Sequence, residues 1–209
     1  MTPRTTQLSP RKAPLQARAL LSIEKILAAA HVVLRRDGAV ATTATSIAAE
    51  AGVAVGSLYQ YFPNKEAVIL ALYERRLAEL RAFVAETHPE GEDWRAALTG
   101  WVVAIKRREL ELGFDFALFD AVYHFALLSQ AASGHAQEMA GALTERLREL
   151  GSDWPDAALF DLALNAFYLN ASTWLYWRAV GHYEPAAIGR LAAAVVAVVA
   201  PAMKDNRPA

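Results

Sequence analysis

The sequence predicts an all-α protein of about nine helices. Apolar residues recur at helical spacing along most of the 209 residues, and Gly and Pro cluster where these patterns stop. No segment alternates with period two between turn signals, so no strand is expected. With 55% hydrophobic and 21% charged residues, the chain is long enough for one large core or two unequal domains.

A basic arm is expected to precede the first helix. Three prolines lie among Arg, Lys, Thr and Ser in residues 1–14, a composition typical of a mobile segment. From Leu15 onward, apolar residues keep helical spacing until Asp37 and Gly38, where the glycine is a C-cap signal.

Two short helices and a long one are expected next. Thr43 can N-cap the first of them through its hydroxyl group, and Gly52 can end it by adopting a positive φ. The second begins at about Val55. Asn64 is a suitable N-cap for the long helix, which ends at about residue 87.

Five further helices follow in the second half of the chain. They are expected over roughly 93–111, 115–131, 135–150, 156–180 and 185–203. The breaks between them are expected at Gly113, Ser133-Gly134, Gly151 to Pro155 and Gly181 to Pro185.

A helix-turn-helix pattern lies in the stretch TTATSIAAEAGVAVGSLYQYFPNKEAV, from Thr42 to Val68. In this motif the second helix can enter a DNA major groove. Steps of 100° per residue place Val55, Leu58 and Phe62 on the apolar side of that helix, with Tyr59 at its edge. The opposite side carries Gly56, Ser57, Gln60 and Tyr61.

The polar side of this short helix suits contact with DNA. Gln60 can pair with a base edge, and the hydroxyl groups of Ser57 and Tyr61 suit phosphates. Gly56 allows close approach of the backbone, and Lys65 adds a positive charge beside the N-terminal amides of the next helix. The alternative is any short helical hairpin with a solvated polar face.

The same stretch closely resembles the DNA-binding signature of TetR-type transcriptional regulators, over about residues 18–72. The residues in register are Ile47-Ala48, Ala51-Gly52-Val53, Gly56, Leu58-Tyr59, Tyr61-Phe62 and Lys65-Glu66, with Ile26 to Ala29 and Gly38 upstream. The resemblance implies that Thr43 holds a phosphate, and that Tyr61 and Lys65 clamp the DNA backbone. The residues it implies to face the groove are Val55, Gly56, Ser57, Tyr59 and Gln60.

Two positions depart from the family pattern. Ala54 occupies a position that is often Ser, which removes a possible helix cap and phosphate contact. Val55 stands where the family often has a polar residue, so it can offer only apolar contact, for instance to a thymine methyl group.

The resemblance also implies the domain order. A helix-turn-helix DNA-binding domain would cover residues 15–63, a linking helix 64–87, and a ligand-binding and dimerisation domain 88–209. The last helix is apolar on nearly all sides, so with the preceding helix it is expected to form half of a four-helix homodimer interface. Two-fold symmetry then predicts a palindromic operator in double-stranded DNA.

Fifteen of the 20 aromatic residues, including all five Trp, lie beyond residue 93. They form either a thickly packed core or the wall of a cavity. The candidate ligand-binding residues come from aromatic faces and from a polar stripe on the helix at 156–180: Trp101, Phe116, Phe119, Tyr123, Asn165, Tyr168 and Ser172. His124 and Asp120 are expected to form a surface ion pair rather than a pocket dyad.

Composition narrows the class of protein further. Residues 1–65 hold eight Lys or Arg against three acidic residues, an electrostatic footprint for a polyanion. The absence of Cys excludes thiolate chemistry, and no phosphate loop, nucleotide fingerprint, nucleophile elbow or metal-binding His spacing is present. We therefore expect no cofactor and no catalysis. The lack of a long apolar run or signal peptide indicates a cytoplasmic protein that does not bind membranes.

The sequence thus predicts a ligand-responsive dimeric DNA-binding regulator. The expected role is a repressor, released from its operator by a small, largely apolar or aromatic effector. Two alternatives stay open: a helical-bundle enzyme acting on apolar substrates, and a constitutive architectural DNA binder with an evenly packed bundle.

Overall fold

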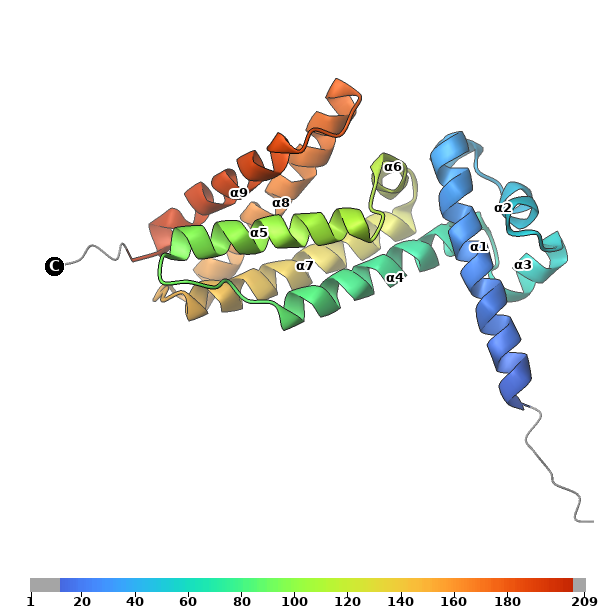
Figure 1. Ribbon diagram of the computed structural model, residues 1–209, viewed down its shortest axis with the longest axis horizontal. Coiled ribbons are helices and arrows are strands. Elements are labelled where there is room, and N and C mark those ends of the chain that lie inside the picture. Colours follow the sequence, from blue (N-terminus) through green and yellow to red (C-terminus); the bar gives the residue numbers. More distant parts are fainter. Residues whose placement is uncertain (1–11, 205–209) are drawn as a thin grey trace, which may run out of the picture. The chain divides into compact units, whose positions relative to one another are not determined.

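The computed structural model describes residues 12–204, and their side chains from residue 19 onward. All regular structure in this range is helical, which confirms the predicted all-α class (Figure 1). The helices are α1 Lys12–Ala41, α2 Ala44–Ala51, α3 Val55–Tyr61, α4 Lys65–Glu86, α5 Trp94–Glu111, α6 Phe116–His124, α7 Ala126–Glu149, α8 Asp156–Val180 and α9 Ala186–Val199, followed by the 3-10 turn η1 Ala200–Ala202.

The chain forms two compact units, and the boundary between Leu72 and Tyr73 falls inside α4. In the first unit, α2 packs against both α1 and α3. Its core consists of fully buried aliphatic side chains: Ile26, Ala30, Leu34, Ile47, Leu58, Val68 and Ile69. Ala30, Leu34, Ile47, Leu58 and Val68 are among the apolar positions from which the helices were predicted.

The start of α1 differs from the prediction. The helix begins at Lys12, so residues 12–14, which we assigned to the basic arm, belong to the helix. Pro14 is tolerated in this first turn because amide groups there have no partner within the helix. The rest of the arm, residues 1–11, lies outside the described part of the chain.

Local capping sets the geometry of the helix-turn-helix, as predicted. The Thr43 hydroxyl accepts a hydrogen bond from the Ser46 amide at 3.0 Å, and the Ser46 hydroxyl accepts one from the Thr43 amide at 3.0 Å. Together these two bonds form a capping box. Gly52 ends α2 with φ 65°, a left-handed conformation that costs little only for glycine.

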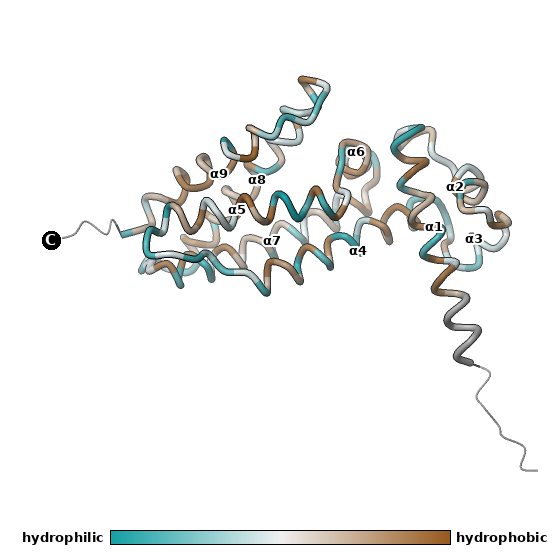
Figure 2. Tube along the Cα trace, in the orientation of Figure 1, coloured by the Kyte–Doolittle hydropathy of each residue, from teal (hydrophilic) through white to brown (hydrophobic). Residues whose placement is uncertain are grey.

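The second unit, described from Tyr73 to Lys204, is a bundle around a mixed aliphatic and aromatic core. In it α8 packs against α7 and α9, and α9 also packs against α5 (Figure 1). Its buried centre includes Trp94, Leu98, Leu147, Leu159, Ala163 and Val199. Hydrophobic and hydrophilic residues alternate along α4 and α7 in Figure 2, as expected for helices with one buried face.

The predicted break at Ser133-Gly134 is wrong. Both residues lie inside α7, and the chain turns instead at Phe125, whose extended backbone (φ −119°, ψ 118°) separates α6 from α7. A glycine inside a helix costs about 1 kcal/mol. Burial of Ala136, Met139 and other side chains farther along the same helix offsets that cost.

None of the helices within residues 12–204 is long and apolar enough to cross a membrane.

Candidate functional site

The short helix α3 presents one buried and one exposed side. Leu58 is fully buried and Phe62 is 9% exposed, so these two residues hold the helix against its unit. Tyr59, which the helical wheel left at the edge, is 53% exposed, and Gly56 and Gln60 are exposed as well. The outward side therefore carries an amide, a phenol and an unobstructed stretch of backbone.

Other residues expected at this surface are partly covered. Val55, Ser57 and Tyr61 are half-buried, and Thr43 is exposed at the start of α2. No side-chain hydrogen bond caps α3 at Ala54, in keeping with the loss of a hydroxyl group at this position. The accessible groups on α3 thus come mainly from its middle and C-terminal half.

Lys65 has a structural role that its sequence position did not indicate. Its ammonium group donates hydrogen bonds to the carbonyl oxygens of Ala39 (3.4 Å), Val40 (3.0 Å) and Thr42 (2.7 Å). These carbonyls lie where α1 ends and the chain turns into α2, a place that favours a cation. Lys65 therefore ties the first turn of α4 to the entry of the helix-turn-helix.

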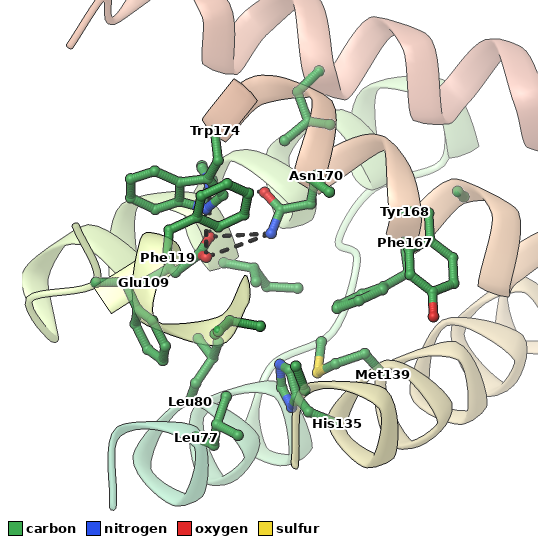
Figure 3. A pocket seen from close by; sticks show the side chains of 18 of the residues that line it. Leu77, Leu80, Glu109, Phe119, His135, Met139, Phe167, Tyr168, Asn170 and Trp174 are labelled. Carbon is green, nitrogen blue, oxygen red and sulfur yellow. Dashed lines mark hydrogen bonds and ion pairs between the residues drawn. The ribbon is translucent and has the colours of Figure 1, made fainter. Parts of the chain in front are cut away.

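The second unit contains a partly open cavity of about 300 Å³. Its wall is mostly apolar and comes from six helices, α4 to α9, together with the turn before α6. Figure 3 shows side chains from several of these helices directed toward one space. Its size and lining are within the range of small-molecule sites.

The cavity contains four of the seven residues predicted to bind ligand. Trp101, Phe119, Tyr123 and Tyr168 line it. The other three do not: Phe116 packs edge-on against Trp174, and Asn165 and Ser172 are exposed. Two residues of the predicted polar stripe, Asn165 and Ser172, thus lie on the outer face of α8, whereas Tyr168 of the same stripe borders the cavity.

His124 and Asp120 form the predicted surface pair. Nδ1 of His124 lies 3.3 Å from a carboxylate oxygen of Asp120, and both side chains are at least 30% exposed. Arg178 also contacts this carboxylate, at 3.2 Å. Neither His124 nor Asp120 lines the cavity.

A buried ion pair occupies one side of the cavity. Lys106 Nζ lies 2.8 Å from Glu109 Oε2, and the two residues are 2% and 7% exposed. Asn170 bridges them: its Oδ1 accepts from Lys106 at 2.8 Å and its Nδ2 donates to Glu109 at 3.4 Å. The indole nitrogen of Trp174 donates to Glu109 Oε1 at 3.1 Å (Figure 3).

Aromatic rings complete the surroundings of Lys106. Its ammonium group lies 4.2 Å from the ring centre of Trp174 and 5.1 Å from that of Trp177, within reach of a cation–π interaction. Burial lowers the pKa of Lys106, while the charge and hydrogen bond of Glu109 oppose this shift. The cluster thus holds two opposite charges that satisfy each other.

His135 lies at another part of the wall, near Met139 and Phe167 (Figure 3). It is 6% exposed, and burial lowers its pKa to about 4, against a raising effect of Glu109 and a further lowering by Arg81. Its imidazole is therefore neutral at physiological pH. Nδ1 makes no hydrogen bond to any residue in the described range.

Sequence reasoning missed these polar residues for identifiable reasons. We expected a helix break just before His135, so we did not place residues on its two sides on one helix face. In the structure α7 is continuous, and its residues Ala132, His135, Met139 and Leu143 share one face and line the cavity. Lys106 and Glu109 lie three residues apart in a run of charged residues, a pattern that predicts a solvent-exposed helix face. Their burial depends on packing against α8, which spacing alone does not reveal.

The helix α4 also contributes to this site. Tyr73, Leu77 and Leu80 line the cavity. Tyr73 packs edge-on against Phe114 at 6.0 Å, and Arg76 donates a hydrogen bond to the carbonyl of Gly113. The turn between α5 and α6 is therefore in direct contact with α4.

Comparisons with known proteins agree with this architecture. Residues 26–72 match the family described as bacterial regulatory proteins, tetR family. A TetR-family transcriptional regulator from Streptomyces coelicolor is 22% identical, with a TM-score of 0.63, and the match covers 90% of this chain and 100% of that one. No curated protein sequence matches the chain.

Two further solved structures contain small molecules. SmeT in complex with triclosan is 21% identical, with a TM-score of 0.58, over 88% of this chain and 93% of that one. The multidrug-binding protein EbrR in complex with imidazole is 20% identical, with a TM-score of 0.59, over 83% of this chain and 93% of that one. At 21% and 20% sequence identity, the similarity to these two proteins shows a shared fold only.

The family match covers the helix-turn-helix, and the fold of the whole chain agrees with it. Residues 26–72 therefore carry the tetR-family DNA-binding region that the sequence signature predicted, and the described chain shares its fold with solved TetR-family regulators. Regulators of this type bind DNA and small-molecule effectors and are generally dimeric and non-enzymatic.

Replacing Lys65 by Met tests its structural role. We expect the free energy of unfolding to fall by about 1 to 2 kcal/mol, because three carbonyl oxygens lose a charged donor. Denaturant unfolding would measure this, with Gln60→Ala as an exposed control that changes stability by less than about 0.5 kcal/mol. Equal stability of Lys65→Met and the unmodified protein would exclude the role.

The low pKa of His135 predicts a pH dependence of stability. The unfolded chain binds a proton near pH 6.5 and the folded protein only near pH 4, so stability is full above pH 6.5 and falls as the pH drops toward 4. Between pH 7 and pH 5 this group alone should cost about 2 kcal/mol. Denaturant unfolding of His135→Phe should show a pH-dependent loss smaller by that amount, and an identical loss would contradict the assignment.

Proposed function

We propose that this protein is a homodimeric repressor that leaves a palindromic operator when a small, largely apolar molecule fills the cavity of its second unit. The observation that carries the proposal is the cavity itself, about 300 Å³ and mostly apolar, in a chain whose first unit holds a TetR-family helix-turn-helix. A constitutive architectural DNA binder would have no need of such a space.

The proposed DNA contacts are of two kinds: reading contacts to base edges and clamping contacts to the phosphate backbone. Gln60 and Tyr59 are exposed on the middle of α3 and can reach base edges, while Gly56 lets the backbone approach closely. Thr43 and Tyr61 can contact phosphates on either side of the groove. Val55 and Ser57 add contacts near the start of α3, and Lys65 adds positive charge.

The proposed dimer forms through α8 and α9. Large apolar side chains are exposed near the end of α8 and in the turn after it: Leu175, Tyr176, Val180 and Tyr183. The exposed side of α9 carries small residues at Ala186, Ala193 and Ala197, which let a second helix approach closely. A four-helix contact between two protomers would cover both groups of residues.

The proposed coupling runs along α4. This helix begins at Lys65, beside the helix-turn-helix, and farther along it carries the cavity residues Tyr73, Leu77 and Leu80. Ligand binding would favour a conformer in which α4 is displaced, so that the two reading helices no longer match successive major grooves. SmeT and EbrR, two proteins of this fold, have each been solved with a small molecule bound.

A mobility-shift titration against the DNA upstream of the protein's own gene tests the proposed function. The protein should bind this DNA more tightly than random DNA at the same salt concentration, and a cavity ligand should release it. Equal affinity for both DNAs would overturn the proposal.

Two substitutions test the division between reading and clamping. Gln60→Ala should cost about 1 to 3 kcal/mol of binding free energy and relax preference at one base pair, because a base-edge contact is lost. Tyr61→Ala should weaken binding to all DNA sequences alike, because a phosphate contact is lost. Fluorescence anisotropy with operator variants would measure both effects, and identical profiles for the two variants would refute the division.

A further inference from the structure

Among the described residues, the cavity wall includes a buried imidazole, that of His135, whose Nδ1 has no hydrogen-bond partner. The imidazole of His135 is 6% exposed, borders the cavity, and packs edge-on against Phe167 at 5.6 Å. Its Nδ1 makes no hydrogen bond with any part of the chain that the structure describes. Buried polar groups are almost always paired, so an unpaired one on a residue that borders a cavity indicates a place for the polar group of a ligand.

The charged groups of the wall are already occupied. Lys106 and Glu109 pair with each other, and Asn170 and Trp174 add further hydrogen bonds to them. Asp115 accepts a hydrogen bond from the amide of Leu118 at 3.0 Å as the N-cap of α6. A charged ligand would have to compete for these partners, and separating a buried ion pair is strongly unfavourable.

The imidazole itself cannot supply a charge. Burial lowers the pKa of His135 to about 4, so at pH 7.5 the ring is neutral, with one nitrogen that donates and one that accepts. A hydroxyl group both donates and accepts, so it can pair with either tautomer. An ammonium group could only donate to the ring and a carboxylate only accept from it, and each would bring a full charge into an apolar space.

We propose that the effector is a neutral, mostly apolar aromatic molecule with a hydroxyl group, and that this hydroxyl hydrogen-bonds to the imidazole of His135. The rings of Phe119, Phe167 and Trp101 supply the apolar wall for the aromatic part. The inference rests on the proposed function only in taking this cavity as the effector site.

Calorimetric titration of the full-length protein at pH 7.5, without DNA, tests the inference with four probes of one shape. These are 2-naphthol, 2-methylnaphthalene, 2-naphthoate and 2-naphthylmethylammonium. We expect 2-naphthol to bind most tightly, and both charged probes to bind at least tenfold more weakly than 2-naphthol.

Substitutions at position 135 separate the hydrogen bond from cavity shape. His135→Phe keeps a ring of similar size but removes the polar nitrogens, so it should weaken 2-naphthol binding about tenfold and leave 2-methylnaphthalene binding unchanged or tighter. His135→Gln restores a donor and an acceptor and should recover 2-naphthol binding to within about threefold of the unmodified protein. His88→Phe, an exposed histidine outside the cavity, is the matched control and should change nothing.

Three results would overturn the inference: tighter binding of a charged probe, equal weakening of 2-naphthol and 2-methylnaphthalene by His135→Phe, or no binding of 2-naphthol at millimolar concentration. Because DNA is absent, these results are independent of repression. If 2-naphthol binds through His135 but leaves the operator complex intact, the inference stands and the proposed release mechanism fails.

Discussion

The buried pair of Lys106 and Glu109 is the interaction on which the cavity depends. It links α5 to α8, because Asn170 and Trp174 of α8 provide the partners that make two buried charges tolerable. An Ala-rich bundle would otherwise gain by collapsing into the space between these helices. Removing one member of the pair would leave an uncompensated charge buried between these two helices.

The same pair decides what kind of molecule the cavity suits. Because the two charges pair with each other inside the wall, the cavity is close to electrically neutral and mostly apolar. His135 adds a ring nitrogen for which residues 12–204 supply no hydrogen-bond partner. In the helix-turn-helix, by contrast, polar side chains stay exposed to solvent. There Leu58 and Phe62 and the internal contacts of Lys65 fix a small core, so that Gln60 and Tyr59 can stay exposed for a polar partner.

The sequence was sufficient where function depends on local structure. The helix-turn-helix was predicted from the caps at Thr43 and Gly52 and from the spacing of apolar residues. These features depend on interactions within a few residues of the chain. It was insufficient where function depends on packing between distant helices. The burial of Lys106 requires α8, and the unbroken course of α7 past Gly134 depends on burial farther along the helix. The sequence placed the polar stripe of α8 in the ligand site, whereas the fold leaves Asn165 and Ser172 exposed and brings only Tyr168 of the three candidates to the cavity.

The proposed thermodynamic coupling between cavity and operator is tested most directly by measuring it in both directions. If a cavity ligand lowers operator affinity by a given factor, operator DNA must lower the affinity for that ligand by the same factor. Anisotropy titration of operator DNA with and without saturating ligand would give the first factor, and calorimetry of the ligand with and without operator DNA would give the second. The account predicts equal factors of about five or more. An operator affinity that is the same with the cavity full and empty would contradict it.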